Sequence, residues 1–424
     1  MAKILVNNSG PLHGAVEISG AKNAVLPLLA ATLMTDQTCI IEGVPELADV
    51  NVMKKMLTNY GASIDDSVKG ELRVTVSEIT SCEGDAALVQ EMRASIFTMG
   101  PMLARAGKVI MPMPGGCTIG KRPIDLHLKG FRALGAEVVE DEENEAVIIS
   151  AGPDGLKGDA IYLDFPSVGA TENILMAATL AKGTTIIENA AKEPEIIDLA
   201  NLLNKMGARI KYAGTDMIRI EGVQKLSGCI HAVIPDRIET GTFMLAAAIT
   251  RGDIFIKNAL PGHVRPIIAK LKECNVDVQI LPDGIYVDAR DRELIATDIK
   301  TLPYPGFPTD IQSPFMAFLT TVKGQSVVRE TVFENRFMHV VELNRMGADI
   351  STQNREAIVP GNKKLHGAKV RATDLRAGAA MVLAGLVASG TTEISEIYHI
   401  ERGYENFVNK FKGLGADIMK ISSD

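Results

Sequence analysis

The chain has 424 residues, of which 46% are hydrophobic and 4% aromatic, and its formal net charge at pH 7 is −8. A chain of this length is expected to form two or more domains, and the acidic charge argues against nucleic acid as the main partner. The N-terminal residues lack a signal-peptide pattern, no apolar run is long enough to cross a membrane, and neither the five cysteines nor the seven histidines have metal-binding or disulfide-framework spacing. The composition predicts a soluble, cytoplasmic globular protein without a metal site.

Helices and strands are predicted to alternate in a fixed order along the chain. A helix of small and apolar residues comes first, then a glycine turn, a strand, a loop and a second helix. The predicted first helices include 21–34, 93–106, 170–181, 240–250 and 375–388. Residues 195–206 form a second helix whose apolar stripe faces one side. Strands are predicted over 184–188 and 391–395, and returning strands over 217–221 and 284–288.

A short motif, apolar–Gly–Ala–X–apolar, marks the end of each second helix. Its glycine recurs at positions 61, 135, 207, 347 and 415, and a degenerate copy has Asn275 there. The spacing of about seventy residues predicts six βαβαββ-type repeats, three per domain, with the break near 228–235. Because the first helices are apolar nearly all round, we expect an α/β architecture with helices inside and sheets outside. The strand region 1–20 precedes the first repeat, and its pattern is compatible with pairing in either half.

The second repeat contains a glycine-rich loop with one cysteine. Residues 114–127 read Pro-Gly-Gly-Cys-Thr-Ile-Gly-Lys-Arg-Pro-Ile-Asp-Leu-His. A lone cysteine is commonly a small buried hydrophobic residue. Here Lys121 and Arg122 favour the thiolate of Cys117, and the glycines allow a ligand to approach the backbone closely. Cys117 is therefore the first candidate for chemistry.

Six cations stand at matching places in the repeats. Three begin first helices and three lie in the loop between a strand and a second helix; these are Lys22, Arg93 and Arg376, and Arg122, Arg336 and Arg402. Each is compatible with a surface ion pair. Their recurrence in an acidic protein instead favours a polyanionic ligand, because helix N-termini and arginines bind phosphates and carboxylates. Three come from each half, so we expect a site between two halves.

Three aspartates near helix starts have two interpretations. Asp310, at the start of the first helix of the fifth repeat, is either an N-terminal cap or a general base facing the cations. Asp125 has the same two interpretations. Asp374 is expected to be a cap or to orient a nearby arginine.

Seven segments resemble the UDP-N-acetylglucosamine 1-carboxyvinyltransferases of the enolpyruvyl transferase family, and the resemblance covers essentially the whole chain. These segments are 19–24 (Ser-Gly-Ala-Lys-Asn-Ala), 92–95 (Met-Arg-Ala-Ser), 114–120, 122–127, 167–171 (Ser-Val-Gly-Ala-Thr), 307–310 (Phe-Pro-Thr-Asp) and 334–339 (Glu-Asn-Arg-Phe-Met-His). The resemblance implies a two-domain inside-out α/β barrel. One domain would span 22–234, and the other 1–21 with 235–424. Phe165 departs from the family, since some relatives carry lysine there.

The family's activity moves the enolpyruvyl group of phosphoenolpyruvate to the 3′-hydroxyl of UDP-N-acetylglucosamine and releases phosphate, without a metal or organic cofactor. The resemblance makes Cys117 the proton donor and the target of the antibiotic fosfomycin, and Asp310 the base. It assigns the phosphate to Lys22, Arg122 and Arg402, and the carboxylate and developing charge to Arg336 and Arg376. The sugar nucleotide would contact Asn23, Arg93, Arg122, Pro123, Ile124, Asp125, Leu126, Ser167, Val168, Gly169 and Val332.

Two other functions are compatible with parts of this pattern. 5-Enolpyruvylshikimate-3-phosphate synthase shares the fold and chemistry but lacks the loop that contains Cys117. A non-catalytic protein that binds UDP-sugar would be favoured by loss of Cys117 or Asp310, and both residues are present.

Overall fold

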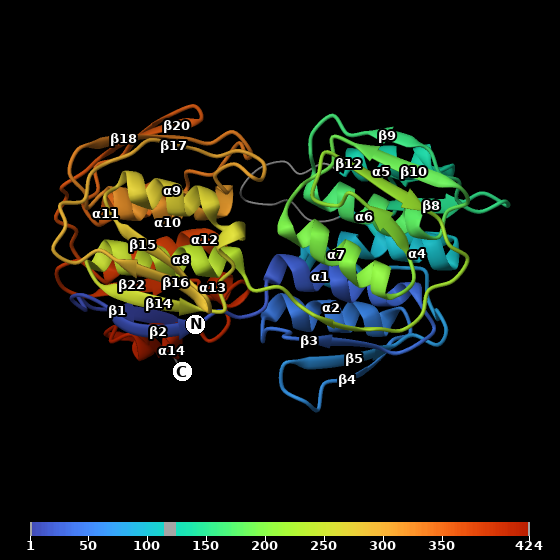
Figure 1. Cartoon of the computed structure of the whole chain (residues 1–424), viewed down its shortest axis with the longest axis horizontal. Coiled ribbons are helices and arrows are strands. Elements are labelled where there is room, and N and C mark those ends of the chain that lie inside the picture. Colours follow the sequence, from blue (N-terminus) through green and yellow to red (C-terminus); the bar gives the residue numbers. More distant parts are fainter. Residues whose placement is uncertain (1, 114–123, 423–424) are drawn as a thin grey trace. The chain divides into compact units, whose positions relative to one another are not determined.

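The computed structural model describes residues 2–113 and 124–422, which fall into two compact α/β units. Residues 20–113 and 124–234 form one unit, and residues 2–19 and 235–422 form the other. Each unit has its own core of buried hydrophobic side chains. Figure 1 labels the elements of both units.

The described residues form six sheets, three in each unit; five of them share one four-strand order, and the sheet β6-β8-β7 has the same order without the lead-in strand. A lead-in strand pairs parallel with the next strand, to which a third and then a fourth strand are added antiparallel. In the unit of residues 20–234 the orders are β13(Ile230–Ala232)–β3(Cys39–Glu42)–β5(Glu71–Thr75)–β4(Ser63–Asp65), β9(Ala160–Tyr162)–β10(Thr184–Glu188)–β12(Met217–Glu221)–β11(Arg209–Lys211), and β6(Lys108–Pro112)–β8(Ala146–Ala151)–β7(Ala136–Asp141). In the other unit they are β2(His13–Glu17)–β14(Asp253–Lys257)–β16(Gly284–Asp288)–β15(Asp277–Leu281), β17(Ile299–Lys300)–β18(Gln325–Arg329)–β20(Glu356–Pro360)–β19(Ser351–Gln353), and β21(Lys369–Arg371)–β22(Thr392–Ser395)–β1(Lys3–Val6)–β23(Ile418–Ile421).

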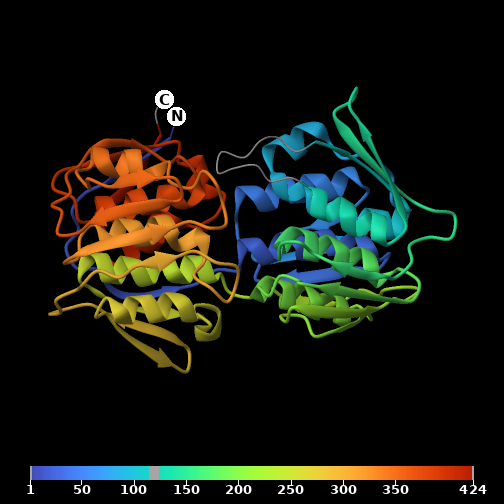
Figure 2. The same ribbon diagram turned by 90° about the horizontal axis from the view of Figure 1, so that it is seen from above.

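The N-terminal strands complete two sheets of the unit that contains residues 235–422. Strand β1 lies between β22 and β23 and pairs antiparallel with both, while β2 pairs parallel with β14. The two chain ends accordingly lie side by side in Figure 2. Hydrogen bonds hold the chain where it passes from one unit to the other: Asp236 N–H donates to the Ser19 carbonyl at 2.9 Å, and Ala21 N–H to the Ile234 carbonyl at 2.8 Å.

Each repeat contributes two helices of different character. The first helices are mostly buried, and they are α1(Lys22–Ala31), α4(Met99–Ala106), α6(Val168–Thr179), α8(Arg237–Thr250), α10(Thr309–Leu319) and α12(Leu375–Gly385). The second helices bury one face, and they are α2(Ala48–Asn59), α5(Asp125–Ala133), α7(Pro194–Lys205), α9(Arg265–Glu273), α11(His339–Arg345) and α14(Phe407–Gly413). Shorter elements are η1(Thr32–Met34), α3(Ala86–Glu91), η2(Arg93–Thr98), η3(Pro261–His263) and α13(Tyr398–Glu401).

Two helices differ from their predicted form, and the predicted helix 21–34 ends with the 3₁₀-helix η1 after α1. The sequence predicts a continuous helix over 93–106, but the segment winds as the 3₁₀-helix η2 before α4 begins at Met99. Pro101 has no N–H to donate to the carbonyl four residues earlier, so the regular α-helical hydrogen bonding is interrupted there.

The Gly-Ala motifs stop the second helices by a common backbone turn. At Gly61, Gly135, Gly207, Gly347 and Gly415, φ lies between 85° and 107°. Asn275 in the degenerate copy also has a positive φ, of 68°. Glycine adopts this left-handed conformation without strain, and asparagine is the side chain that tolerates it best. The motif is therefore a helix stop, which explains its recurrence.

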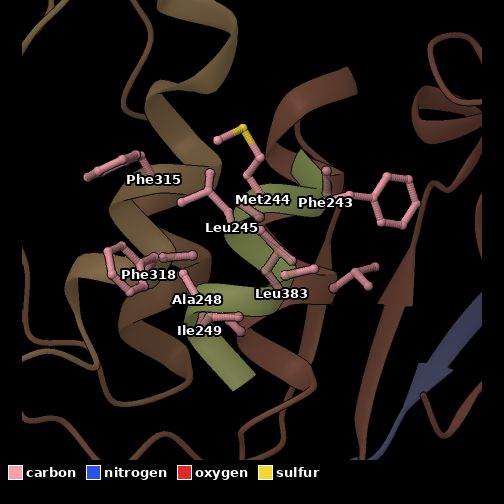
Figure 3. Packing of buried hydrophobic residues seen from close by; sticks show 14 of the residues in the cluster. Phe243, Met244, Leu245, Ala248, Ile249, Phe315, Phe318 and Leu383 are labelled. Atoms are coloured by element: carbon pink, nitrogen blue, oxygen red, sulfur yellow. The ribbon is translucent and has the colours of Figure 1, made fainter. Parts of the chain in front are cut away.

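The core of the unit with residues 235–422 lies between its first helices. Helices α8, α10 and α12 contact one another, and Phe315 meets Phe318 edge to face with ring centroids 5.6 Å apart. Figure 3 shows these rings beside Leu245 and Ala248 of α8 and Leu383 of α12. Small residues on these helices allow close approach, so the polar helix starts are held in fixed positions.

Candidate active site

The predicted site residues that the structure describes form one group in each unit. Cys117, Arg122 and Pro123 lie outside the described residues. The group in the unit of residues 235–422 surrounds the start of α10, and the other group surrounds the starts of α1, α5 and α6.

Asp310 binds two of the predicted arginines. Its Oδ1 accepts a hydrogen bond from Arg336 Nη2 at 2.9 Å, and its Oδ2 accepts one from Arg376 Nε at 3.2 Å. The arginine side chains are only 4% and 2% exposed, whereas the Asp310 side chain is 26% exposed. One carboxylate thus pairs with two buried guanidinium groups, and guanidinium groups are suited to binding an anion.

Aromatic rings and unpaired donors complete this charged group. The Arg376 guanidinium lies 5.1 Å from the centre of the Tyr404 ring, and that of Arg336 lies 5.5 Å from the Phe333 ring. Burial opposes the charge of Arg376, but Tyr404 and Asp310 raise its pKa, so it remains a cation. Within residues 2–113 and 124–422, Arg336 Nε and Arg376 Nη1 have no hydrogen-bond acceptor. Buried donors of this kind are costly unless an acceptor is supplied.

Asp374 is the cap of α12, which confirms that prediction. Its Oδ1 accepts hydrogen bonds from the backbone N–H groups of Arg376 and Ala377, at 2.9 Å and 3.1 Å. Asp310 differs, because Pro308 occupies the N-cap position of α10 and Asp310 is the second residue of the helix. Asp310 is therefore not the N-cap residue, and its carboxylate is hydrogen-bonded to the two arginines.

Arg402 is positioned by the same end of α12. It follows α13, which packs so closely on α12 that a side chain at Gly378 would overlap Ile400 at 2.4 Å. A side chain at the neighbouring Gly403 would overlap Leu375 at 2.6 Å. The half-buried Arg402 lowers the pKa of His399, after burial of that ring as the larger cause. The close packing fixes a third cation near the start of α12.

Glu330 is an organising residue that the sequence did not reveal. It follows β18, is 1% exposed, and accepts hydrogen bonds from Val332 N–H at 2.8 Å and from the hydroxyl groups of Thr301 and Thr309 at 2.8 Å and 2.9 Å. It thereby ties the predicted substrate-contacting Val332 to the residue that precedes Asp310. A glutamate directly after a buried strand is the only local signal for this role.

His339 adds no charge to the group. Burial lowers its pKa to about 4, with Arg336 as a further cause. The neutral ring contacts Met316 Sδ through Nε2 at 3.3 Å. The positive charge near Asp310 therefore comes from the arginines.

In the other unit, Lys22 begins α1 and pairs with Asp49. Its Nζ lies 2.9 Å from Asp49 Oδ2, and the two side chains are 13% and 3% exposed. Asp49 lies in the first turn of α2, and the sequence analysis did not single it out. Asn23 follows Lys22 and is half-buried. The ion pair holds the lysine beside the positive end of the α1 dipole.

His127 joins three further predicted segments. A side chain at Gly169 would lie 3.2 Å from the His127 ring, and Arg93 is close enough to lower the pKa of that histidine, which burial first lowers, to about 3. His127 Nδ1 is 3.0 Å from the amide nitrogen of Asn173. Asn173 also accepts a hydrogen bond from Gly100 N–H at 2.7 Å. This buried network brings the starts of η2, α5 and α6 together.

The starts of α5 and α6 carry the remaining predicted contacts. Ser167 caps α6 by accepting a hydrogen bond from Ala170 N–H at 3.4 Å, and Val168 and Gly169 form the first turn. Ile124 precedes α5, Asp125 is its exposed first residue, and Leu126 packs against the core. Two neighbouring helix N-termini with unbonded N–H groups are suited to a diphosphate.

The described part of the chain shows neither a metal-ligand cluster nor a helix long and apolar enough for a membrane crossing. Its polar sites are built from cations and helix N-termini. The arrangement can bind anions and can offer one carboxylate as a proton acceptor.

Comparisons with known proteins agree over the full length. The family model for EPSP synthase (3-phosphoshikimate 1-carboxyvinyltransferase) matches residues 6–411. The chain is 55% identical to the UDP-N-acetylglucosamine 1-carboxyvinyltransferase of Finegoldia magna, with 99% of both chains covered. It is 56% identical to UDP-N-acetylglucosamine 1-carboxyvinyltransferase 1 of Caldanaerobacter subterraneus subsp. tengcongensis, again over 99% of both.

Solved structures share the fold. The enolpyruvyl transferase NikO from Streptomyces tendae matches with a TM-score of 0.89 at 24% identity, covering 100% of this chain and 99% of that one. EPSP synthase from Acinetobacter baumannii matches with a TM-score of 0.78 at 20% identity over 100% of both chains. Together with the full-length identity to the curated relatives, this shows that the chain belongs to the enolpyruvyl transferase family, among its UDP-N-acetylglucosamine 1-carboxyvinyltransferases.

Proposed function

We propose that the chain transfers the enolpyruvyl group of phosphoenolpyruvate to the 3′-hydroxyl of UDP-N-acetylglucosamine and releases inorganic phosphate, the first committed step of peptidoglycan synthesis. The observation that carries this proposal is the identity of 55% and 56%, over 99% of the chain, to relatives named for that reaction. The arginine group around Asp310 supports it, since both substrates are anions.

The proposed reaction is an addition followed by an elimination. Asp310 accepts the proton of the sugar hydroxyl, whose oxygen bonds to the central carbon of phosphoenolpyruvate, while Cys117 protonates the methylene carbon. Loss of a proton from that carbon and of phosphate from the central carbon then restores the double bond. The Asp310 carboxylate supports its part because two hydrogen bonds from guanidinium groups fix it in place.

We assign the anionic groups of phosphoenolpyruvate to the cations. Lys22, Arg122 and Arg402 bind its phosphate, and Arg336 and Arg376 bind its carboxylate and the charge that develops during addition. The unpaired Nε of Arg336 and Nη1 of Arg376 support the second assignment. Fixed cations of this kind stabilise a transition state without reorganising.

We assign the sugar nucleotide to the helix starts of the unit with residues 20–234. Its diphosphate meets the N-termini of α5 and α6, and its contacts are Asn23, Arg93, Arg122, Pro123, Ile124, Asp125, Leu126, Ser167, Val168, Gly169 and Val332. The network through His127 supports this, because it fixes the starts of α5, α6 and η2 against one another. The proposal also includes alkylation of Cys117 by fosfomycin, and in each unit an inside-out barrel whose buried helices are enclosed by its three sheets.

A coupled assay of phosphate release tests the function. Phosphoenolpyruvate and UDP-N-acetylglucosamine together should release phosphate, and omission of either should abolish release. The matching family model makes shikimate 3-phosphate the informative alternative acceptor. Release with shikimate 3-phosphate but not with the UDP-sugar would contradict the proposal. Binding of UDP-N-acetylglucosamine by calorimetry without any phosphate release would indicate a non-catalytic protein.

A further inference from the structure

Two cysteines lie opposite each other on neighbouring strands of the unit with residues 20–234. Strands β13 and β3 pair parallel with Ile230 opposite Ile40, so Cys229 and Cys39 face each other one residue earlier. The Ile40 N–H donates to the Cys229 carbonyl at 2.8 Å, which shows that the pairing extends to this position. Neighbouring strands are about 4.7–4.9 Å apart, within the range of about 4.4–6.8 Å between the Cα atoms of a disulfide.

The side chains at this position point to the same face of the sheet. Cys39 is buried on the side of Ile41, and the half-buried Cys229 packs against the same core. The closeness of the two thiols lowers the pKa of Cys229 and raises that of Cys39, and burial raises the pKa of Cys39 further. Lys205, whose Nζ donates to the Ile230 carbonyl at 3.3 Å, further favours the Cys229 thiolate.

The fold itself does not require two thiols at this position. The preceding Gly228 lies against Thr38, where an added Cβ would come within 2.2 Å of the Thr38 carbonyl oxygen. The same close approach recurs at Gly158 against Thr184 and at Gly367 against Thr391, at 2.3 Å in both cases. In the other two sheets, the pair of residues equivalent to Cys229 and Cys39 follows these glycines. It is Asp159 opposite Thr185 in one sheet and Ala368 opposite Thr392 in the other. Polar or small side chains therefore fill the equivalent places.

We propose that Cys39 and Cys229 form a redox-active dithiol that closes to an intramolecular disulfide by exchange with a low-molecular-weight disulfide. Cys229, the accessible member, is the attacking thiol. Cys39, buried beside it, is the resolving thiol. The bond would join β3 and β13, which are neighbours in the sheet although they are its first and last strands along the chain. The two cysteines are about 190 residues apart in the sequence.

The exchange balances as two displacements. The Cys229 thiolate attacks one sulfur of the small disulfide, forms a mixed disulfide and releases the first small thiolate. The Cys39 thiol then gives up its proton and attacks the Cys229 sulfur, which breaks the mixed disulfide and releases the second small thiolate. The small disulfide is reduced to two thiols, and the two cysteines are oxidised to cystine.

Peptide mapping of the full-length protein tests the proposal. The protein is incubated with glutathione disulfide and then unfolded in urea at low pH, its free thiols are alkylated with iodoacetamide after the pH is raised, and it is digested with trypsin without reduction. We expect the peptides 23–54 and 226–237 to appear joined, two hydrogens lighter than their sum, and to separate after treatment with dithiothreitol. Cys229→Ser should leave Cys39 alkylated, whereas Cys274→Ser, which changes another buried cysteine, should leave the joined peptide intact.

Two results would overturn the proposal, and both come from the unaltered protein. One is full alkylation of Cys39 and Cys229 after exposure to glutathione disulfide. The other is glutathione retained on Cys229 while Cys39 is alkylated, because this would show that the second displacement does not occur. Neither result depends on a variant that must fold.

Discussion

Asp310→Asn is the most informative perturbation of the charged group, because it removes a charge and almost no volume. Asparagine has the size of aspartate, so packing at the start of α10 should persist. Arg336 and Arg376 would keep their positive charges but lose the carboxylate that accepts their hydrogen bonds. The variant therefore separates the electrostatic role of this side chain from its shape.

The expected cost follows from the burial of the two arginines. Removing one partner of a buried ion pair destabilises by about 3–5 kcal/mol. The arginines are 4% and 2% exposed, but the Asp310 side chain is 26% exposed, and water screens part of the effect. We expect the free energy of unfolding to fall by roughly 2–4 kcal/mol, which lowers the Tm of a unit of this size by roughly 5–15 °C. Loss of the base should lower kcat by about a hundredfold or more.

Calorimetry and the phosphate-release assay measure the two effects separately. Asp283→Asn makes the same chemical change in an exposed hairpin and serves as the matched control. Arg336→Gln should lower the free energy of unfolding less in the Asp310→Asn background than in the original protein. In that background the arginine has lost its carboxylate partner, so its removal takes away an unbalanced charge. We expect a coupling of roughly 1–3 kcal/mol in this double-mutant cycle.

Two results would refute the roles assigned to Asp310. An unchanged Tm for Asp310→Asn, together with additive effects of Arg336→Gln, would show that the carboxylate does not balance the arginines in solution. A lowered Tm with unchanged kcat would keep the ion pairs but remove Asp310 from the chemistry.

Further predictions concern the proton donor, the turn at Glu330 and three buried titratable residues. Cys117→Asp should retain measurable turnover and Cys117→Ser should lose nearly all of it, since serine is too weak an acid; equal activities would refute the acid role. Glu330→Gln should lower the free energy of unfolding by about 2 kcal/mol and raise KM for the UDP-sugar, because one amide hydrogen would face a donor; an unchanged KM would limit its role to stability. Stability should fall as pH drops below about 6.5, since the unfolded histidines bind protons there while His127 and His339, with pKa values of about 3 and about 4, do not; a urea midpoint equal at pH 7.5 and pH 5 in the Glu172→Gln variant, which lacks the opposing effect of that carboxyl, would contradict this. Burial, with Glu195 and Glu193 nearby, raises the pKa of Glu172, so stability should also decline as pH rises above about 4.5, and Glu172→Gln should remove that decline in urea titrations.

Local sequence patterns predicted the repeat but not the partners of the strands within residues 1–20. The Gly-Ala motif was visible because a left-handed turn restricts the residue type at one position, as at Gly207 and Asn275. The strands within 1–20 carried no such restriction. Their partners β22, β23 and β14 lie hundreds of residues away in the chain, and a strand's own pattern specifies which face is buried rather than which strand it joins.

The candidate site was predictable to the extent that its residues mark helix starts. Arg336 and Arg376 were found by their repeat positions, and the structure brings both to Asp310. Asp310 and Asp374 look alike in sequence, yet a shift of two residues relative to the helix start makes one a cap and directs the other to the arginines. Glu330 and Asp49 went unnoticed because a buried carboxylate is recognised only by the donors around it, and these come from distant segments.

The hydrogen bonds at Ser19 and Ala21 make the unit of residues 20–234 an insertion within the other unit. Its two ends meet, so it can fold as soon as residue 234 is synthesised. The host unit has its first two strands at the start of the chain, and β1 acquires its partners β22 and β23 only when the last residues appear. At ~5–20 residues per second, β1 waits roughly 20–80 s for β23. During translation, therefore, β1 emerges long before its partners, and its exposed edges need protection until those strands are made.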